Sequence, residues 1–200
     1  MTDNSDNAPP EAAGYPVTLR LAGRSVLVAG GGRIAARRVE RLLKTGARVV
    51  VIAPDVLPAL SEAGEAGALV WHRRDVREAD VAGMQLVFAA TDDSSVNDQL
   101  ARAARRQGIW VQRADAAEDS DFLVPALVER GPLQIAISSA AAAPSLTRRV
   151  RAHIETLTPR AYGELASLAR RFRDDVRARI PRQKRAAFWD EIFEGPIAEQ

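Results

Sequence analysis

The clearest chemical signal in the sequence is a run of three glycines. Residues 30–35 read GGGRIA and match the pattern G-x-G-x-x-G/A. In this pattern Gly30 makes a tight turn, Gly32 lets a pyrophosphate approach the backbone, and the small Ala35 allows a helix to pack closely on a strand. The N-terminus of that helix offers free N–H groups to the phosphates. The run therefore predicts a dinucleotide-binding turn that contains Gly30 and Gly32.

The segments around the glycines make the pattern more specific. Residues 25–30 are a short apolar run rich in β-branched side chains, which is typical of a buried strand. Apolar residues then recur at helical spacing, at Ala35, Val39, Leu42 and Leu43. Gly46 stands where a helix is usually capped, and residues 47–53 repeat the strand pattern before Pro54 ends it. Strand, glycine turn, helix and strand make a βαβ unit.

The same alternation continues further along the chain. Residues 68–72, 85–90 and 109–112 have strand character. Between the last two lies a helical stripe, formed by Val96, Leu100, Ala103 and Ala104. Strands that alternate with helices favour a parallel sheet with helices on both faces. We therefore predict an α/β fold, with a Rossmann-type doubly wound NAD-binding domain over residues 15–123.

The pattern changes after this domain. Two apolar runs, residues 122–128 and 133–138, flank the turn sequence ERGP and predict a hairpin. From Pro144 onward the chain has helical stripes with apolar faces, which we expect to pack on another subunit. The expected organisation is a disordered lead over residues 1–14, the Rossmann domain, a dimerisation hairpin segment over 124–156 and a helical C-terminal domain over 157–200.

Composition excludes several classes of protein. The sequence has no cysteine, which excludes disulfides, thiolate metal sites and a cysteine nucleophile. No apolar run approaches the roughly 20 residues of a membrane helix. The first residues lack the features of a secretory signal. We therefore expect a cytoplasmic protein with no membrane partner. We also expect no nucleic-acid partner, because no basic stripe is interleaved with aromatic residues.

One part of the dinucleotide pattern is displaced. An acid that binds the ribose is expected about 20 residues past the glycines, at the end of the second strand. Ile52 and Ala53 occupy that place, and the nearest acid is Asp55, behind Pro54. Asp55 either binds the ribose or is a turn residue after the proline. We favour NAD as the cofactor, while Arg33 and Arg48 leave NADP open.

The chain as a whole resembles the family of precorrin-2 dehydrogenases and siroheme synthase N-terminal regions, in the stand-alone form. The matching stretches are residues 15–32, 89–93, 96–97, 122–125, 136–139 and 185–193. The resemblance implies a Rossmann domain, a central dimerisation segment and a helical tail. It also implies a homodimer that oxidises precorrin-2 to sirohydrochlorin with NAD⁺. Some members of the family also insert Fe²⁺ as a further substrate to give siroheme.

The resemblance also implies particular site residues. The family pattern Asn-Val-x-Asp-x-Pro corresponds to residues 112–117, where Gln112 and Ala117 depart from it and Asp115 is kept. Asp115 is therefore the expected catalytic base. Read without the resemblance, it is one surface acid among several in its loop. The cofactor contacts of the family correspond to Arg33, Ile34, Pro54 and Asp55, and we add Thr91 from the matching stretch 89–93.

The predicted substrate site includes departures from the family. Ser139 is expected in the pocket, and it is followed by Ala140 and Ala141 where the family usually has two glycines. Precorrin-2 carries many carboxylates, for which Arg113 and Arg148 are candidate partners. We predict no resident metal site, because the only histidines are isolated in the sequence. If Fe²⁺ is inserted, Asp115 is expected to assist.

Two other hypotheses remain. The first is a non-catalytic sensor or carrier of the same fold that binds NAD or a tetrapyrrole. The second is a different small dehydrogenase, although the Tyr-x-x-x-Lys pair of the short-chain type is absent, since Ala166 follows Tyr162 at that spacing. Formation of NADH together with tetrapyrrole binding would separate the enzyme from the binding module.

Overall fold

The computed structural model describes residues 14–194 of the chain, so the lead expected at residues 1–14 lies outside the described part except for Gly14. The chain divides into two compact units, Met1–Leu123 and Val124–Gln200. The first contains a parallel sheet with its helices, and the second contains a hairpin and the C-terminal helices.

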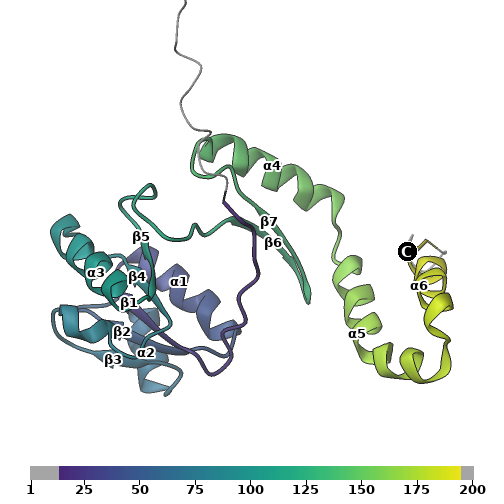
Figure 1. Cartoon of the computed structure of the whole chain (residues 1–200), viewed down its shortest axis with the longest axis horizontal. Helices are drawn as coiled ribbons and strands as arrows, with labels where there is room; N and C mark the ends of the chain where they lie inside the picture. The colour runs from purple at the N-terminus through teal and green to yellow at the C-terminus, as the bar shows by residue number, and fades with distance from the viewer. Residues whose placement is uncertain (1–13, 195–200) are drawn as a thin grey trace, which may run out of the picture. The chain divides into compact units, whose positions relative to one another are not determined.

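A five-stranded parallel sheet forms the centre of the first unit (Figure 1). Its strands are β1 (Ser25–Ala29), β2 (Arg48–Ile52), β3 (Val70–His72), β4 (Leu86–Ala89) and β5 (Trp110–Arg113), and their order across the sheet is β3-β2-β1-β4-β5. β1 pairs with β2 on one side and β4 on the other. Strands buried on both faces need apolar residues throughout, as in the sequence VLVA of β1.

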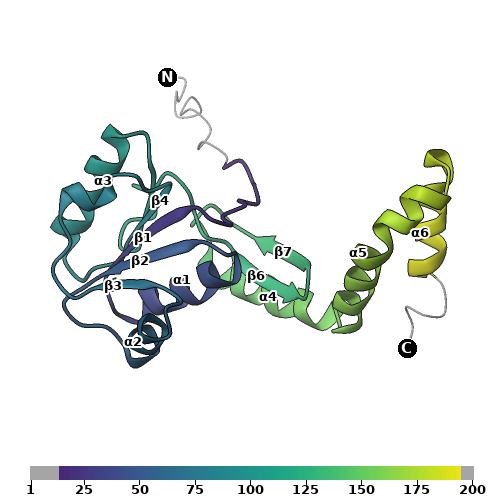
Figure 2. The same ribbon diagram turned by 90° about the horizontal axis from the view of Figure 1, so that it is seen from below.

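Helices cover both faces of the sheet, with α3 on one face and α1 and α2 on the other (Figure 2). The helices are α1 (Arg33–Lys44), α2 (Pro58–Glu65) and α3 (Ser94–Arg106), and a short 3₁₀ turn, η1, spans Glu78–Val81. This arrangement confirms the predicted Rossmann-type doubly wound fold. α2 and η1 were not expected from the sequence, because they are short and have few apolar positions.

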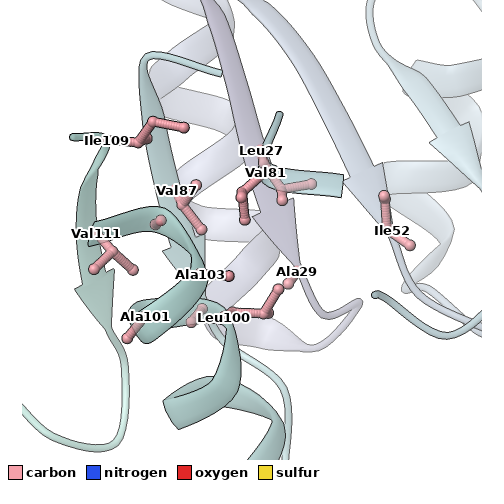
Figure 3. Close-up of a cluster of buried hydrophobic side chains, with 12 residues drawn as sticks. Leu27, Ala29, Ile52, Val81, Val87, Leu100, Ala101, Ala103, Ile109 and Val111 are labelled. Atoms are coloured by element: carbon pink, nitrogen blue, oxygen red, sulfur yellow. The ribbon is translucent and has the colours of Figure 1, made fainter. Parts of the chain in front are cut away.

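The core between α3 and the sheet is made of small and branched side chains (Figure 3). Leu27 and Val87 point to this face from the two central strands, and Leu100 meets them from α3. The alanines of α3, including Ala101 and Ala103, are fully or almost fully buried and let the helix lie close to the strands. The apolar stripe seen in the sequence therefore packs on the sheet as predicted.

The second unit begins with an antiparallel hairpin of β6 (Ala126–Arg130) and β7 (Leu133–Ile137), which confirms the predicted hairpin. The first strand starts later than the apolar run 122–128 suggested. Phe122 instead belongs to the first unit, where its ring meets that of Phe88 edge-on at 5.4 Å. An aromatic pair of this geometry stabilises the connection by about 1 kcal/mol beyond burial.

Three helices and a 3₁₀ turn follow the hairpin: α4 (Pro144–Leu157), α5 (Ala161–Arg179), η2 (Arg182–Lys184) and α6 (Arg185–Glu194). α4 lies alongside the hairpin in Figure 1. No residue of α4 is fully buried, and its apolar stripe remains open to solvent in the single chain, with Leu146 58% and Leu157 62% exposed. Within the described residues no helix has the length and apolar character needed to cross a bilayer.

The turn before α4 holds two alanines in an unusual conformation. Ala140 and Ala141 have φ angles of 50° and 68°, the left-handed region that glycine favours. Each Cβ there lies too close to the following carbonyl oxygen, at a cost of roughly 1–2 kcal/mol. The backbone therefore keeps a conformation suited to glycine, although the sequence has alanine at both positions.

Replacing either alanine with glycine should stabilise the protein. Ala140→Gly and Ala141→Gly are each expected to raise the free energy of unfolding by about 0.5–1 kcal/mol, after allowing for the greater freedom of glycine in the unfolded chain. Chemical denaturation of the full chain measures this change. Ala142→Gly is the matched control, because Ala142 lacks a positive φ and should lose stability. Equal changes in the free energy of unfolding at all three positions would show that the backbone of Ala140 and Ala141 is not strained.

Candidate functional site

The strand order reverses between β1 and β4, and ligands of open α/β sheets bind outside the strand ends at such a point. The structure has a cleft of about 640 Å³ there. Its walls come from the segments that follow β1, β2 and β4, namely Gly30 to Gly32, Ala53 to Leu57 and Ala90 to Asp93, with Asp75, Val76 and Val96 beside them. The cleft thus brings together Gly30, Gly32, Pro54, Asp55 and Thr91 of the predicted cofactor site.

Two of the three glycines are required by the packing of the protein itself. Gly30 has a φ of +115°, and a β-carbon on it would collide with the carbonyl oxygen of Ala90. A β-carbon on Gly31 would collide with the carbonyl oxygen of Asp55. The Gly31 carbonyl in turn accepts a hydrogen bond from the N–H of Leu57 at 3.0 Å. These contacts hold the segments that follow β1, β2 and β4 close together.

Gly32 is different, because its missing side chain leaves open space. A β-carbon on Gly32 would meet no atom within 4 Å among the described residues. Gly32 is the N-cap of α1, and no side chain caps the helix there. The first N–H groups of α1 are therefore free to bind an anion beside the cleft. This geometry fits the pyrophosphate of a dinucleotide, and Arg33 and Ile34, both exposed, occupy the first turn.

The part of the cleft that follows β2 has an acid, Asp55, and an arginine that was not expected from the sequence. Asp55 is exposed, and its Oδ1 lies 3.4 Å from Nη2 of Arg73, which follows β3. Arg48 starts β2, so it lies at the opposite end of that strand from the cleft. Among the described residues, the cation that pairs with Asp55 is Arg73, which could not be expected from the sequence because its approach depends on the pairing of β2 with β3.

Thr91 is held by a buried amide. The Oδ1 of Asn97, which is 0% exposed, accepts hydrogen bonds from the N–H of Thr91 at 3.1 Å and from its hydroxyl at 2.8 Å. Nδ2 of Asn97 donates back to the Thr91 carbonyl at 3.0 Å. Asp93 caps α3 by accepting from the N–H of Ser95 at 2.8 Å. The loop after β4 is thereby fixed from within, and Asn97 is a positioning residue.

Asp115 lies just past the carboxyl end of β5, beside the first residue of α3. Its carboxylate is paired with Arg113 through two contacts, Oδ2 to Nη2 at 2.9 Å and Oδ1 to Nε at 3.3 Å. The pairing with Arg113 lowers the pKa of the Asp115 carboxyl to about 2, aided by a hydrogen bond from Ser94 and opposed by partial burial. The acid is therefore fully ionised at neutral pH.

Arg113 is buried, with 9% of its side chain exposed, and is occupied by partners of its own chain. The predicted role of Arg113 as a partner of substrate carboxylates remains a prediction, and this pairing does not favour it. Gln112, at the departure from the family pattern, is also buried and donates to the Arg113 carbonyl.

The loop that carries Asp115 folds back along the free edge of β5. The N–H of Val111 donates to Oδ2 of Asp121 at 2.8 Å, and the N–H of Arg113 donates to Oγ of Ser120 at 2.9 Å. The N–H of Asp121 in turn donates to the Val111 carbonyl at 2.9 Å. The outer side of β5 is thus satisfied by its own loop, which holds the Asp115 segment against the sheet.

Ser139 and Arg148 belong to the second unit. The Ser139 hydroxyl accepts hydrogen bonds from the N–H of Ala143 at 3.1 Å and from the hydroxyl of Thr147 at 2.9 Å, so it supports the start of α4. Arg148 is exposed and donates to Oγ of Ser145 at 3.1 Å. Their predicted roles in substrate binding stay predictions.

No group of three or more His, Cys, Asp or Glu side chains in the described part of the chain is arranged to hold a metal ion. The two histidines, His72 on β3 and His153 on α4, are exposed and belong to different units.

A strand, a glycine turn and an uncapped helix at the switch point of a doubly wound sheet define a dinucleotide-binding domain. In agreement, a family model described as putative NAD(P)-binding matches residues 17–126. Two further models match the second unit: the sirohaem biosynthesis protein central model matches residues 130–157, and the sirohaem synthase dimerisation region matches residues 161–200. The boundary predicted near residue 156 within this unit stays a prediction.

Known proteins that are similar to most of this chain define its family. The solved structure of SirC, precorrin-2 dehydrogenase, matches with a TM-score of 0.80 and 30% identity, covering 93% of this chain and 92% of that one. Siroheme synthases of Stutzerimonas stutzeri (strain A1501) and Methylobacillus flagellatus are 44% and 43% identical over 92% of this chain. The chain spans 40% of the length of these curated relatives. It belongs to the precorrin-2 dehydrogenase family.

The contrast between Gly31 and Gly32 leads to a prediction about cofactor binding. Gly32→Ala should leave stability unchanged, because the new methyl group meets only open space. It should weaken NAD⁺ binding about tenfold or more, equivalent to about 1.4 kcal/mol, because the methyl group occupies the place of the pyrophosphate. Calorimetric titration with NAD⁺ measures the affinity.

Gly31→Ala is the matched control for this prediction. Its methyl group collides with backbone, so thermal unfolding should show a loss of about 1–3 kcal/mol. Unchanged NAD⁺ affinity in Gly32→Ala would mean that the phosphates do not approach this glycine.

Proposed function

We propose that this chain catalyses the NAD-dependent oxidation of precorrin-2 to sirohydrochlorin, a step of siroheme biosynthesis in the cytoplasm. The observation that carries the proposal is the placement of an ionised acid, Asp115, just past the end of β5, the strand that pairs with β4, whose following loop lines a dinucleotide cleft in which Gly32 faces open space. Membership of the precorrin-2 dehydrogenase family supports the choice of substrate.

Different residues of the chain would bind the cofactor and accept the proton. The free N–H groups at the start of α1 bind the pyrophosphate, and the Thr91 loop, fixed by Asn97, forms the wall beside it. When bound, NAD⁺ supplies the acceptor for a hydride. The substrate loses one hydride and one proton, and Asp115 accepts the proton and later releases it to water.

The low pKa of Asp115 is compatible with this role. A carboxylate with a pKa of about 2 is a weak base toward a neutral C–H or N–H. Departure of a hydride leaves a cationic macrocycle, whose remaining proton is far more acidic. The order of events that suits Asp115 is therefore hydride loss first, or well advanced, with proton transfer following it.

The test is a spectroscopic assay under anaerobic conditions. Precorrin-2 and NAD⁺ should give sirohydrochlorin and NADH in equal amounts with the wild-type chain. Asp115→Asn should lower kcat by about 100-fold or more, because general-base catalysis contributes factors of this size. NAD⁺ affinity should not change, since Asp115 does not line the cofactor cleft.

Glu118→Gln is the matched control, an exposed acid in the same loop for which the structure records no ion pair among residues 14–194. It should keep wild-type kcat. Binding of NAD⁺ and tetrapyrrole without turnover would overturn the proposal and favour the sensor or carrier hypothesis. Insertion of Fe²⁺, for which Asp115 is also the candidate, stays a separate prediction.

We also propose that the second unit forms a homodimer. The exposed stripe of α4, including Leu146 and Leu157, needs a partner surface, and the dimerisation-region model matches the helices that follow it. Leu146→Glu with Leu157→Glu should shift the sedimentation coefficient from dimer to monomer. Val70→Glu, at an exposed position on edge strand β3, should not. A monomeric wild-type chain at micromolar concentration would contradict the proposal.

A further inference from the structure

The side chain of Arg113 combines deep burial with an unusual number of anionic neighbours. Only 9% of it is exposed, although it projects from the last residue of an edge strand. Both its Nε and its Nη2 contact the Asp115 carboxylate, at 3.3 and 2.9 Å. A planar guanidinium that meets a carboxylate through two nitrogens sets the direction of that carboxylate as well as its distance.

The remaining contacts of Arg113 come from α3 and from the same loop that carries Asp115. Nη1 lies 2.8 Å from Oδ2 of Asp119 and 3.4 Å from Oδ1 of Asp98, and Nη2 lies 3.1 Å from Oγ of Ser94. Asp98 and Ser94 belong to α3, whereas Asp119 belongs to the loop after β5. The guanidinium therefore ties the Asp115 loop to the first turns of α3, directly behind the Thr91 loop that lines the cleft.

The three carboxylates differ in how much they depend on Arg113. Asp119 is also paired with Nη1 of Arg105 at 2.8 Å, and Asp98 is also paired with Arg102. Within the described residues, Arg113 is the only ion-pair partner of Asp115. Loss of the Arg113 charge would leave Asp98 and Asp119 with their own arginines, while Asp115 would keep hydrogen bonds from Ser94 and from its own backbone N–H but no ion pair among the described residues.

The loop itself is held by other bonds. Its backbone stays attached to β5 through Asp121 and Ser120, which accept from the N–H groups of Val111 and Arg113 at 2.8 and 2.9 Å. Neither bond uses the guanidinium. Removing the guanidinium should therefore release the Asp115 side chain without releasing the loop.

We propose that Arg113 is a positioning residue for Asp115, which it holds in one orientation, ready to accept a proton, beside the first turn of α3. This inference rests on the oxidation proposed above. Arg113 does not meet the substrate in this arrangement, since its own chain occupies the guanidinium. The pairing lowers the pKa of Asp115, and the charged groups around the pair are Asp98 from α3 and Asp119 from the loop.

The experiment compares Arg113→Met, Arg113→Lys and the control Arg105→Met in the full chain. Arg105 shares Asp119 with Arg113 and does not contact Asp115, so its loss disturbs the network without releasing the acid. The first measurement is a titration of the Asp115 side-chain carbon by ¹³C NMR, with Asp115→Asn for assignment. The second is the separate determination of kcat and of KM for NAD⁺ and precorrin-2.

We expect the Asp115 signal of the wild type and of Arg105→Met to stay in its ionised position down to about pH 3. In Arg113→Met the midpoint should rise to the ordinary value of 3.8 or above. The kcat of this variant should fall tenfold or more with little change in KM for NAD⁺. Arg113→Lys keeps the positive charge but loses the two-nitrogen contact of the guanidinium with the carboxylate. Its titration midpoint should therefore return closer to the wild-type value than its kcat does.

Two results would overturn the inference: a midpoint in Arg113→Met that equals that of the wild type, or a kcat that is unchanged or higher. If Arg113→Met does not fold, Arg113→Lys provides the test. A full wild-type kcat in Arg113→Lys would show that the two-nitrogen contact with Asp115 is not needed, and would contradict the inference. A wild-type chain that does not oxidise precorrin-2 would refute the proposed function separately, while the titration would still show whether Arg113 controls Asp115.

Discussion

The first unit depends on the close approach of backbones at the ends of its central strands. Gly30 lies against the Ala90 carbonyl and Gly31 against the Asp55 carbonyl, at distances that a β-carbon would forbid. The segments after β1, β2 and β4 can meet only because two side chains are missing. The cleft, the uncapped start of α1 and the fixed Thr91 loop all follow from this approach. The glycine run thus serves the architecture at two positions, while the third, Gly32, faces open space.

Much of the fold could be predicted because the periodicity of apolar residues and the turn residues are local features of the sequence. The parallel strands, α1, α3 and the hairpin followed from periodicity and turn residues, and the glycine turn followed from its place between strand and helix. Asp115 became a candidate for the catalytic base only because residues 112–117 resemble a family pattern. α2 and η1 could not be predicted, because short segments with few apolar residues give only a weak periodic pattern. Alanine normally indicates helix, so the residue types at 140 and 141 did not predict a left-handed conformation, and the family's glycines at these positions were the one indication of it.

Other parts of the site could not be predicted because they depend on residues distant in sequence. Arg73 reaches Asp55 through the pairing of β2 with β3, and Asn97 reaches Thr91 from inside α3. Arg113 read as a free cation for an anionic substrate, yet the structure places it among Asp98, Asp115 and Asp119. Arginine in a sequence shows an available charge, and only the folded chain shows whether that charge is already neutralised.

The loop after β5 has a consequence beyond its acid. Strands at the margin of a sheet are sites where a second chain can add a strand and start aggregation. Here the side chains of Ser120 and Asp121 take the N–H groups that such a chain would seek. Protection against misassembly and the placement of Asp115 are thus performed by the same few residues. A substitution at Ser120 or Asp121 would therefore act twice, by exposing the edge of β5 and by loosening the segment that carries Asp115.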